Sequence, residues 1–179
     1  RVREDIEIVL LEKGSDISYA TCGLPYYFSG EIPLEKDLNV VSADLLRKRY
    51  NIDVRLNTEA LAIEPAAKSV SIRKPDGTTE TLEYSKLIYA AGATPLIPPL
   101  PGKDANNFFT MRTLDDLRKM DRYLKQSPVI SICVIGGGLI GLEMAENLAM
   151  KGYAVTVVEK APSILGPFDS EFSNQAQDV

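Results

Sequence analysis

Apolar residues along this chain follow two spacings, and the first of them is typical of strands. The short apolar run Ile6–Glu12, which ends in an acid, predicts a buried strand. Across residues 53–92 apolar and polar positions alternate, with a turn signal at Asp76-Gly77, so this region predicts several further strands. Residues 93–102 contain four prolines and predict an extended loop.

The second spacing, with apolar residues three or four positions apart, is typical of helices. It occurs over residues 42–52, which begin with Ser42, a residue suited to cap a helix. It occurs again over residues 113–126, where Thr113 and Asp116 have the spacing of a capping box. Two amphipathic helices are therefore expected, one on each side of the strand-rich region.

A glycine pattern of the form G-x-G-x-x-G lies between a predicted strand and a predicted helix. Its glycines are Gly136, Gly138 and Gly141. The apolar strand 129–135 precedes them, and a helix follows with apolar residues every four positions. A second strand, 154–158, leads into Glu159, 18 residues after the last glycine. This order predicts a dinucleotide-binding βαβ unit, although a glycine turn without a ligand remains the alternative.

Each position of the pattern has its own physical reason. Gly136 permits a tight turn, Gly138 lets the backbone approach a pyrophosphate, and Gly141 lets the helix lie close to the strand. The free N–H groups at the helix start then face the phosphates. Glu159 is suited to accept hydrogen bonds from a ribose diol and to repel a 2′-phosphate, which favours NADH over NADPH. The neighbouring Lys160 weakens that preference.

Composition excludes several classes of function. A net charge of -5 and a pI near 4.9 argue against nucleic acid as a partner. No apolar run has the length of a membrane span, and the charged N-terminal residues do not resemble an export signal. Two distant cysteines and no histidine give neither a disulfide framework nor a metal site. The pattern favours a reducing, cytoplasmic location.

The two cysteines lie in contrasting surroundings. Cys22 stands in a tyrosine-rich turn before Gly-Leu-Pro, and Pro25 suits the first turn of a helix. A helix N-terminus stabilises a thiolate, the reactive form of cysteine, but a thiol packed as a small apolar group is an equal alternative. Cys133 lies inside an apolar strand and is predicted to be buried and without chemistry.

At this point the sequence resembles a known family. The segments EKGSDISYATCGLPYYFSG, KLIYAAGATPLIPPLPG, FFTMRTLDDL and VIGGGLIGLEMAENL are similar to those of the flavoprotein pyridine nucleotide-disulfide oxidoreductases. The nearest branch is the single-cysteine group of coenzyme A-disulfide reductase, persulfide and polysulfide reductases, and NADH oxidase and peroxidase. No second cysteine lies near Cys22, so the resemblance implies either a mixed disulfide with a small thiol or a sulfenic acid.

The resemblance also implies the fold and its division. It implies an α/β fold with two Rossmann-like nucleotide-binding domains, for FAD and for NAD(P)H, both incomplete in this chain. Residues 1–111 would be the FAD-binding domain without its first strand, glycine loop and most of its first helix. Residues 112–179 would begin the NAD(P)H-binding domain. The chain alone is expected to be inactive, and the full-length protein is expected to be a homodimer.

Carried over position by position, the resemblance implies a set of cofactor contacts. Those expected at FAD are Glu12, Lys13, Ala60, Ala91, Gly92 and Arg112. Those expected near the flavin and nicotinamide are Leu139, Ile140 and Glu143, beside the glycines and Glu159 already described. Leu139 stands where relatives often have Tyr or Phe. Thr21 stands where coenzyme A-disulfide reductases often have Asn, which leaves the tuning of the thiol and the acceptor open.

Three functions are therefore weighed. The leading one is an FAD-dependent enzyme that uses NADH, or alternatively NADPH, to reduce a low-molecular-weight disulfide or persulfide through Cys22, with coenzyme A disulfide as the first choice. The second is an NADH oxidase or peroxidase that cycles Cys22 through a sulfenic acid. The third is a non-catalytic nucleotide-binding module.

Overall fold

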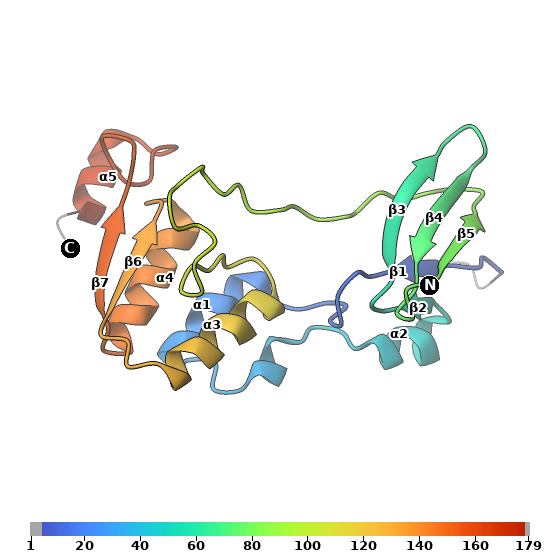
Figure 1. Cartoon of the computed structure of the whole chain (residues 1–179), viewed down its shortest axis with the longest axis horizontal. Helices are drawn as coiled ribbons and strands as arrows, with labels where there is room; N and C mark the ends of the chain where they lie inside the picture. Colours follow the sequence, from blue (N-terminus) through green and yellow to red (C-terminus); the bar gives the residue numbers. More distant parts are fainter. Residues whose placement is uncertain (1–4, 178–179) are drawn as a thin grey trace. The chain divides into compact units, whose positions relative to one another are not determined.

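Two compact units make up the α/β fold of this chain (Figure 1). A computed structural model describes residues 5–177. The first unit contains residues 5–19 and 39–94, and the second contains residues 20–38 and 95–177. No helix among these described residues combines the length and apolar character that crossing a membrane requires.

A parallel strand pair and one helix form part of the first unit. Strand β1 (Val9–Leu11) pairs with β2 (Asp53–Arg55), with Leu10 opposite Val54. Helix α2 (Ala43–Tyr50) precedes β2, and the Ser42 hydroxyl accepts a hydrogen bond from the Leu45 amide at 3.1 Å. The predicted helix and its cap are thus confirmed.

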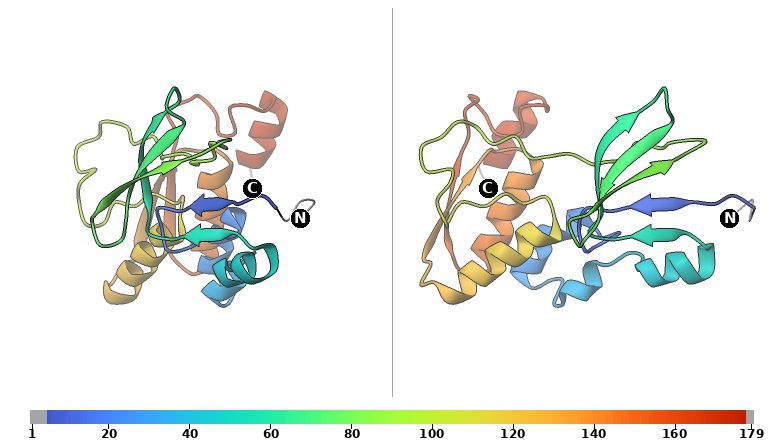
Figure 2. Two further views of the ribbon diagram at one scale, coloured as in Figure 1. Left: turned by 90° about the vertical axis from the view of Figure 1, so that its right-hand side faces the viewer. Right: turned by 45° about the vertical axis from the view of Figure 1, so that its right-hand side comes forward.

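An antiparallel meander completes the first unit (Figure 2). Its strands are β3 (Glu59–Glu64), β4 (Ser69–Arg73) and β5 (Thr79–Glu83). The alternation predicted for β4 is confirmed, because Val70 and Ile72 are buried. The turn between β4 and β5 is confirmed as well: Gly77 has a φ of 83°, and Asp76 Oδ1 accepts a hydrogen bond from the Thr78 amide at 2.9 Å.

Two strand predictions for the first unit are wrong in extent. Of the run Ile6–Glu12 only β1 is a strand, and it is partly exposed rather than buried, because the described elements do not cover its faces completely. Residues 85–92 join none of the three described sheets. Their apolar side chains are exposed, Ile88 by 89%, since no neighbouring strand covers or pairs with them.

The second unit contains the predicted capped helix. Helix α3 (Leu114–Gln126) begins at a complete capping box: the Asp116 amide donates to Thr113 Oγ1 at 3.1 Å, and the Thr113 amide donates to Asp116 Oδ2 at 3.0 Å. Leu117 is fully buried and Met120 nearly so, which confirms the predicted apolar face. The preceding residues 93–100 have no regular secondary structure, as the prolines predict.

The predicted βαβ unit follows α3 in the chain. It consists of β6 (Ser131–Ile135), α4 (Leu139–Met150) and β7 (Ala154–Val158), and the two strands are parallel, with Cys133 opposite Thr156. The other elements of the unit are the 3-10 turn η1 (Thr21–Gly23), α1 (Leu24–Ser29), the 3-10 turn η2 (Glu35–Leu38) and α5 (Ser170–Gln177). Helix α1 packs against α4 and α3.

Candidate functional site

The glycine loop has the geometry that its spacing predicts. Gly136 has a φ of 109°, and its amide donates to the Val158 carbonyl at 2.8 Å, so it turns the chain at the end of β6. A Cβ at Gly141 would overlap the carbonyl oxygen of Gly136, which explains why the helix needs glycine there. A Cβ at Gly138 would meet no described atom within 4 Å, so its backbone is open to a ligand.

Glu159 is fixed at the carboxyl end of β7 beside this loop. Its Oε1 accepts from the Ala161 amide and its Oε2 from the Gly137 amide, both at 2.7 Å. These hydrogen bonds, from Ala161 and then Gly137, hold the pKa of Glu159 below its usual value. A carboxylate offers about four lone-pair positions, so it can still accept from two ribose hydroxyls. The residues present therefore fit the adenosine ribose of a dinucleotide.

The sequence did not reveal a second support of the loop. After β7 the chain returns, and the Leu165 amide donates to the Gly137 carbonyl at 2.8 Å. A Cβ at Gly137 would lie 2.7 Å from Ile164 Cγ2. Leu165 takes a φ of 53°, which is uncommon outside glycine. In the sequence, only the run of three consecutive glycines indicated that Gly137 also has a structural role.

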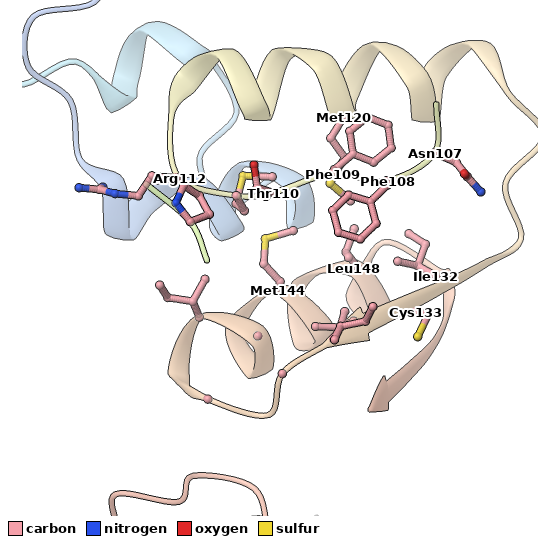
Figure 3. Close-up of a pocket in the computed structure, with 18 of the residues that line it drawn as sticks. Asn107, Phe108, Phe109, Thr110, Arg112, Met120, Ile132, Cys133, Met144 and Leu148 are labelled. Atoms are coloured by element: carbon pink, nitrogen blue, oxygen red, sulfur yellow. The ribbon is translucent and has the colours of Figure 1, made fainter. Parts of the chain in front are cut away.

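A cavity of about 1380 Å³ lies in the second unit between the α3 side and the βαβ side (Figure 3). Residues from the segment 107–112, α3, β6 and α4 line it. The structure brings several predicted site residues to this cavity, namely Arg112, Gly136, Gly138, Leu139, Ile140 and Gly141. Leu139 and Ile140 are each 60% exposed at the start of α4, whereas Glu143, one turn later, is half-buried.

The thiol of Cys22 is exposed, in the turn that leads into α1. Gly23 caps this helix and Pro25 lies in its first turn, so the predicted helix start is confirmed. The exposure disfavours the alternative of a thiol packed as an apolar group. Neither this cysteine nor Cys133 is in a disulfide.

The prediction that Cys133 is buried is wrong. The residues on its face of the β6–β7 pair are all exposed, because no described element covers that face; they are Ser131, Cys133, Ile135, Ala154, Thr156 and Val158. An apolar strand sequence indicates burial only when both faces of the sheet are covered.

The first unit brings three of the expected FAD contacts near one another. Glu12 follows β1, and its carbonyl accepts from the Thr58 amide at 2.9 Å, so the start of β3 with Ala60 lies beside it. Its Oε1 accepts from the Gly14 amide at 2.6 Å. Lys13 is paired with Glu59 at 2.8 Å, and its hydrogen bond lowers the pKa of that carboxyl.

The remaining expected FAD contacts lie elsewhere in the chain. Ala91 and Gly92 are exposed in the irregular segment 85–92, where Gly92 has a φ of 70°. Arg112 belongs to the second unit, as does Cys22, the predicted catalytic residue. For the nucleotide end of FAD, the ordered carboxylate of Glu12 at the carboxyl end of a parallel strand offers acceptor oxygens that fit the hydroxyls of a ribose.

The fold and these sites define a nucleotide-binding α/β protein with a βαβ unit and an exposed thiol. The chain belongs to the pyridine nucleotide-disulphide oxidoreductase family, whose model matches residues 2–179. Members of this family use FAD and NAD(P)H.

Individual relatives agree with this assignment. The chain is 33% identical over 168 residues to an NADH oxidase of Methanocaldococcus jannaschii, covering 94% of this chain and 38% of that one. It is 31% identical over 175 residues to an NAD(P)H sulfur oxidoreductase (CoA-dependent) of Pyrococcus abyssi, covering 97% and 38%. The structure of reduced CoADR-RHD from Bacillus anthracis matches with a TM-score of 0.96 and 36% identity, covering 99% and 32%. The chain thus spans 38% of the length of each of these two curated relatives.

Proposed function

We propose that this chain is part of an FAD-dependent NAD(P)H oxidoreductase that reduces a low-molecular-weight disulfide or persulfide through Cys22, with a coenzyme A disulfide as the leading substrate. The observation that carries the proposal is the exposed thiol of Cys22 in a turn fixed to α1. The names of the Pyrococcus abyssi and Bacillus anthracis relatives support the coenzyme A assignment. The working protein is proposed to be a cytoplasmic homodimer.

The chemistry at Cys22 is thiol–disulfide exchange. Its thiolate attacks one sulfur of the substrate disulfide, forms a mixed disulfide and releases the first thiol. Two electrons and a proton then cleave the mixed disulfide, which releases the second thiol and restores the Cys22 thiolate. Bound FAD supplies the transfer of these electrons from NAD(P)H to sulfur.

The other proposed roles concern binding. Glu12 and Lys13, with the backbone at Ala60, Ala91 and Gly92 and the side chain of Arg112, are assigned to FAD. Gly136, Gly138 and Gly141 are assigned to the dinucleotide phosphates, Glu159 to its ribose, and Leu139, Ile140 and Glu143 to the nicotinamide end. A fixed, ionised Glu159 repels a 2′-phosphate, so NADH is the proposed reductant.

The division into domains remains part of this proposal. We assign residues 1–111 to FAD binding and residues 112–179 to NAD(P)H binding. The compact units are divided differently, because residues 20–38 and 95–111 belong to the same unit as the βαβ elements. A binding domain and a packing unit need not coincide.

A second candidate function follows from another relative. The Methanocaldococcus jannaschii protein is named an NADH oxidase, which supports oxygen or peroxide as the acceptor. Cys22 would then cycle through a sulfenic acid. A non-catalytic nucleotide-binding module is the third reading.

Paired cysteine variants test these functions in the intact holoprotein. We expect Cys22→Ser to abolish NADH-dependent reduction of coenzyme A disulfide, and Cys133→Ser to retain it. Oxygen or peroxide consumption without added disulfide, lost in Cys22→Ser, would favour the oxidase or peroxidase. Unchanged activity of every kind in Cys22→Ser would refute a catalytic role for this cysteine.

A further inference from the structure

One residue, Leu38, holds the turn of Cys22 from both sides. Before the cysteine, the Ala20 amide donates to the Leu38 carbonyl at 2.8 Å. The Gly23 amide then donates back to the Ala20 carbonyl at 3.0 Å, which closes the 3-10 turn. Leu38 is completely buried, at 0% exposure. The backbone around Cys22 therefore depends on where Leu38 lies.

The side chain of Leu38 also contacts the residue after the cysteine. A Cβ at Gly23 would lie 2.7 Å from Leu38 Cδ2 and 3.0 Å from Ile32 Cδ1. Gly23 is buried, so Leu38 packs directly against its backbone. Any displacement of Leu38 would move the turn at Ala20 and at Gly23 together.

Leu38 ends the turn η2, and an ion pair between Glu35 and Arg118 joins η2 to α3. Arg118 donates from Nε at 3.1 Å and from Nη2 at 2.6 Å to Glu35 Oε1. A third nitrogen, Nη1, donates to Asp115 on the same helix at 3.2 Å, which orients the guanidinium. Both partners are partly buried, and the capping box makes α3 a firm support.

Resting on the proposed role of Cys22, we propose that Arg118 is a positioning residue for this thiol. Arg118 holds Glu35, and with it η2, in place. Leu38 at the end of η2 in turn holds the backbone at Ala20 and Gly23. The guanidinium need not touch the substrate or a cofactor. Removing the Arg118 side chain takes this contact away from η2, and the turn around Cys22 then opens more often.

The test compares two variants of the same helix in the intact holoprotein. Arg118→Met removes the contact with Glu35. Lys119→Met is the matched control, because it removes an exposed positive charge from the same helix. The first readout is amide hydrogen exchange of residues 20–24. The second is the ratio of the Cys22 alkylation rate in the variant to that in the wild type, measured well below the melting temperature of both proteins so that global unfolding does not contribute. The third is the steady-state kinetics of disulfide reduction.

We expect Arg118→Met to speed amide exchange at residues 20–24 by about fivefold, the effect of losing a partly exposed charge-assisted hydrogen bond. The alkylation ratio should rise, and kcat for disulfide reduction should fall with KM for NADH unchanged. Lys119→Met should leave all three readouts as in the wild type. Glu35→Gln, which keeps an acceptor oxygen but loses the charge, should give an intermediate result.

Specific outcomes would overturn the inference. If amide exchange and the alkylation ratio stay unchanged in both Arg118→Met and Glu35→Gln, Arg118 does not position Cys22. Equal changes in Lys119→Met would point to general loosening of α3 and would also overturn it. If the turn loosens as expected but the wild type reduces no disulfide, the positioning stands and the proposed function fails.

Discussion

Glu159 is held by backbone amides rather than by a basic side chain. Amides from Ala161 and Gly137 bind its two oxygens, and both belong to loops whose positions depend on the carboxylate. Its pKa is lower in the folded chain than its ordinary value of 4.5. A group of this kind stabilises the fold above its unfolded-state pKa, and that contribution is lost as the pH falls through its folded-state pKa.

This gives a prediction for Glu159→Gln. At pH 7 the variant should be less stable than the wild type, because glutamine has one acceptor oxygen and its NH2 group cannot accept the second of the two hydrogen bonds. The difference should shrink as the pH falls below 4.5 and the wild-type carboxylate takes up a proton. Chemical denaturation across this pH range measures it. A stability difference that does not depend on pH would contradict the account.

The sequence predicted Glu159 and the three motif glycines because their roles depend on local spacing. It did not predict Ile164 or Leu165, since nothing in the segment APSILG indicates that it folds back on the loop. Contacts made across a turn of irregular backbone leave no periodic signal.

At the scale of elements, the close approach of α4 to β6 rests on Gly141. The obstacle to a side chain there is the backbone carbonyl of Gly136, which cannot rotate away as a flexible side chain could. The position of the start of α4 therefore depends on the backbone at the end of β6.

We expect Gly141→Ala to destabilise the second unit by about 1–3 kcal/mol or more, because the added methyl group forces α4 away from the loop. NADH binding should weaken at the same time. Gly166→Ala is the control, since a Cβ at Gly166 meets no described atom within 4 Å. Thermal unfolding of both variants measures the effect, and equal melting temperatures would refute it.

The helices and the meander were predictable because their caps, turns and apolar spacing are local. The strand content of residues 6–12 and 85–92 was overestimated for the opposite reason. Apolar residues favour a strand, but a strand forms only where a neighbour pairs with its backbone. The described chain offers β1 one partner and residues 85–92 none.

At the scale of the whole molecule, residues 20–38 pack in a unit with elements that follow about a hundred residues later. Helix α1, which follows Cys22, packs against α4 of the βαβ unit. The sequence did identify the thiol and the helix start. It contained no local signal for the distant element that α1 would contact, so the packing had to come from the structure.

Exposed irregular chain between the meander and α3 offers a test of the proposed FAD contacts at Ala91 and Gly92. Tyr89 is 77% exposed, whereas Tyr123 in α3 is half-buried. Chymotrypsin should cut first after Tyr89 in the flavin-free protein. Added FAD should slow this cut and leave later cuts unaffected. If FAD gives no protection, Ala91 and Gly92 do not hold it.

The packing of Ile164 on Gly137 has a consequence for how such chains vary. A motif search treats position 137 as any residue, yet an alanine Cβ there would lie 2.7 Å from the Ile164 side chain. Side chains at positions 137 and 164 therefore compete for the same space. Across related proteins, a larger residue between the first two glycines should be accompanied by a smaller one at the position of Ile164. Libraries that randomise the motif alone would miss these paired solutions, and libraries that randomise both positions would find them.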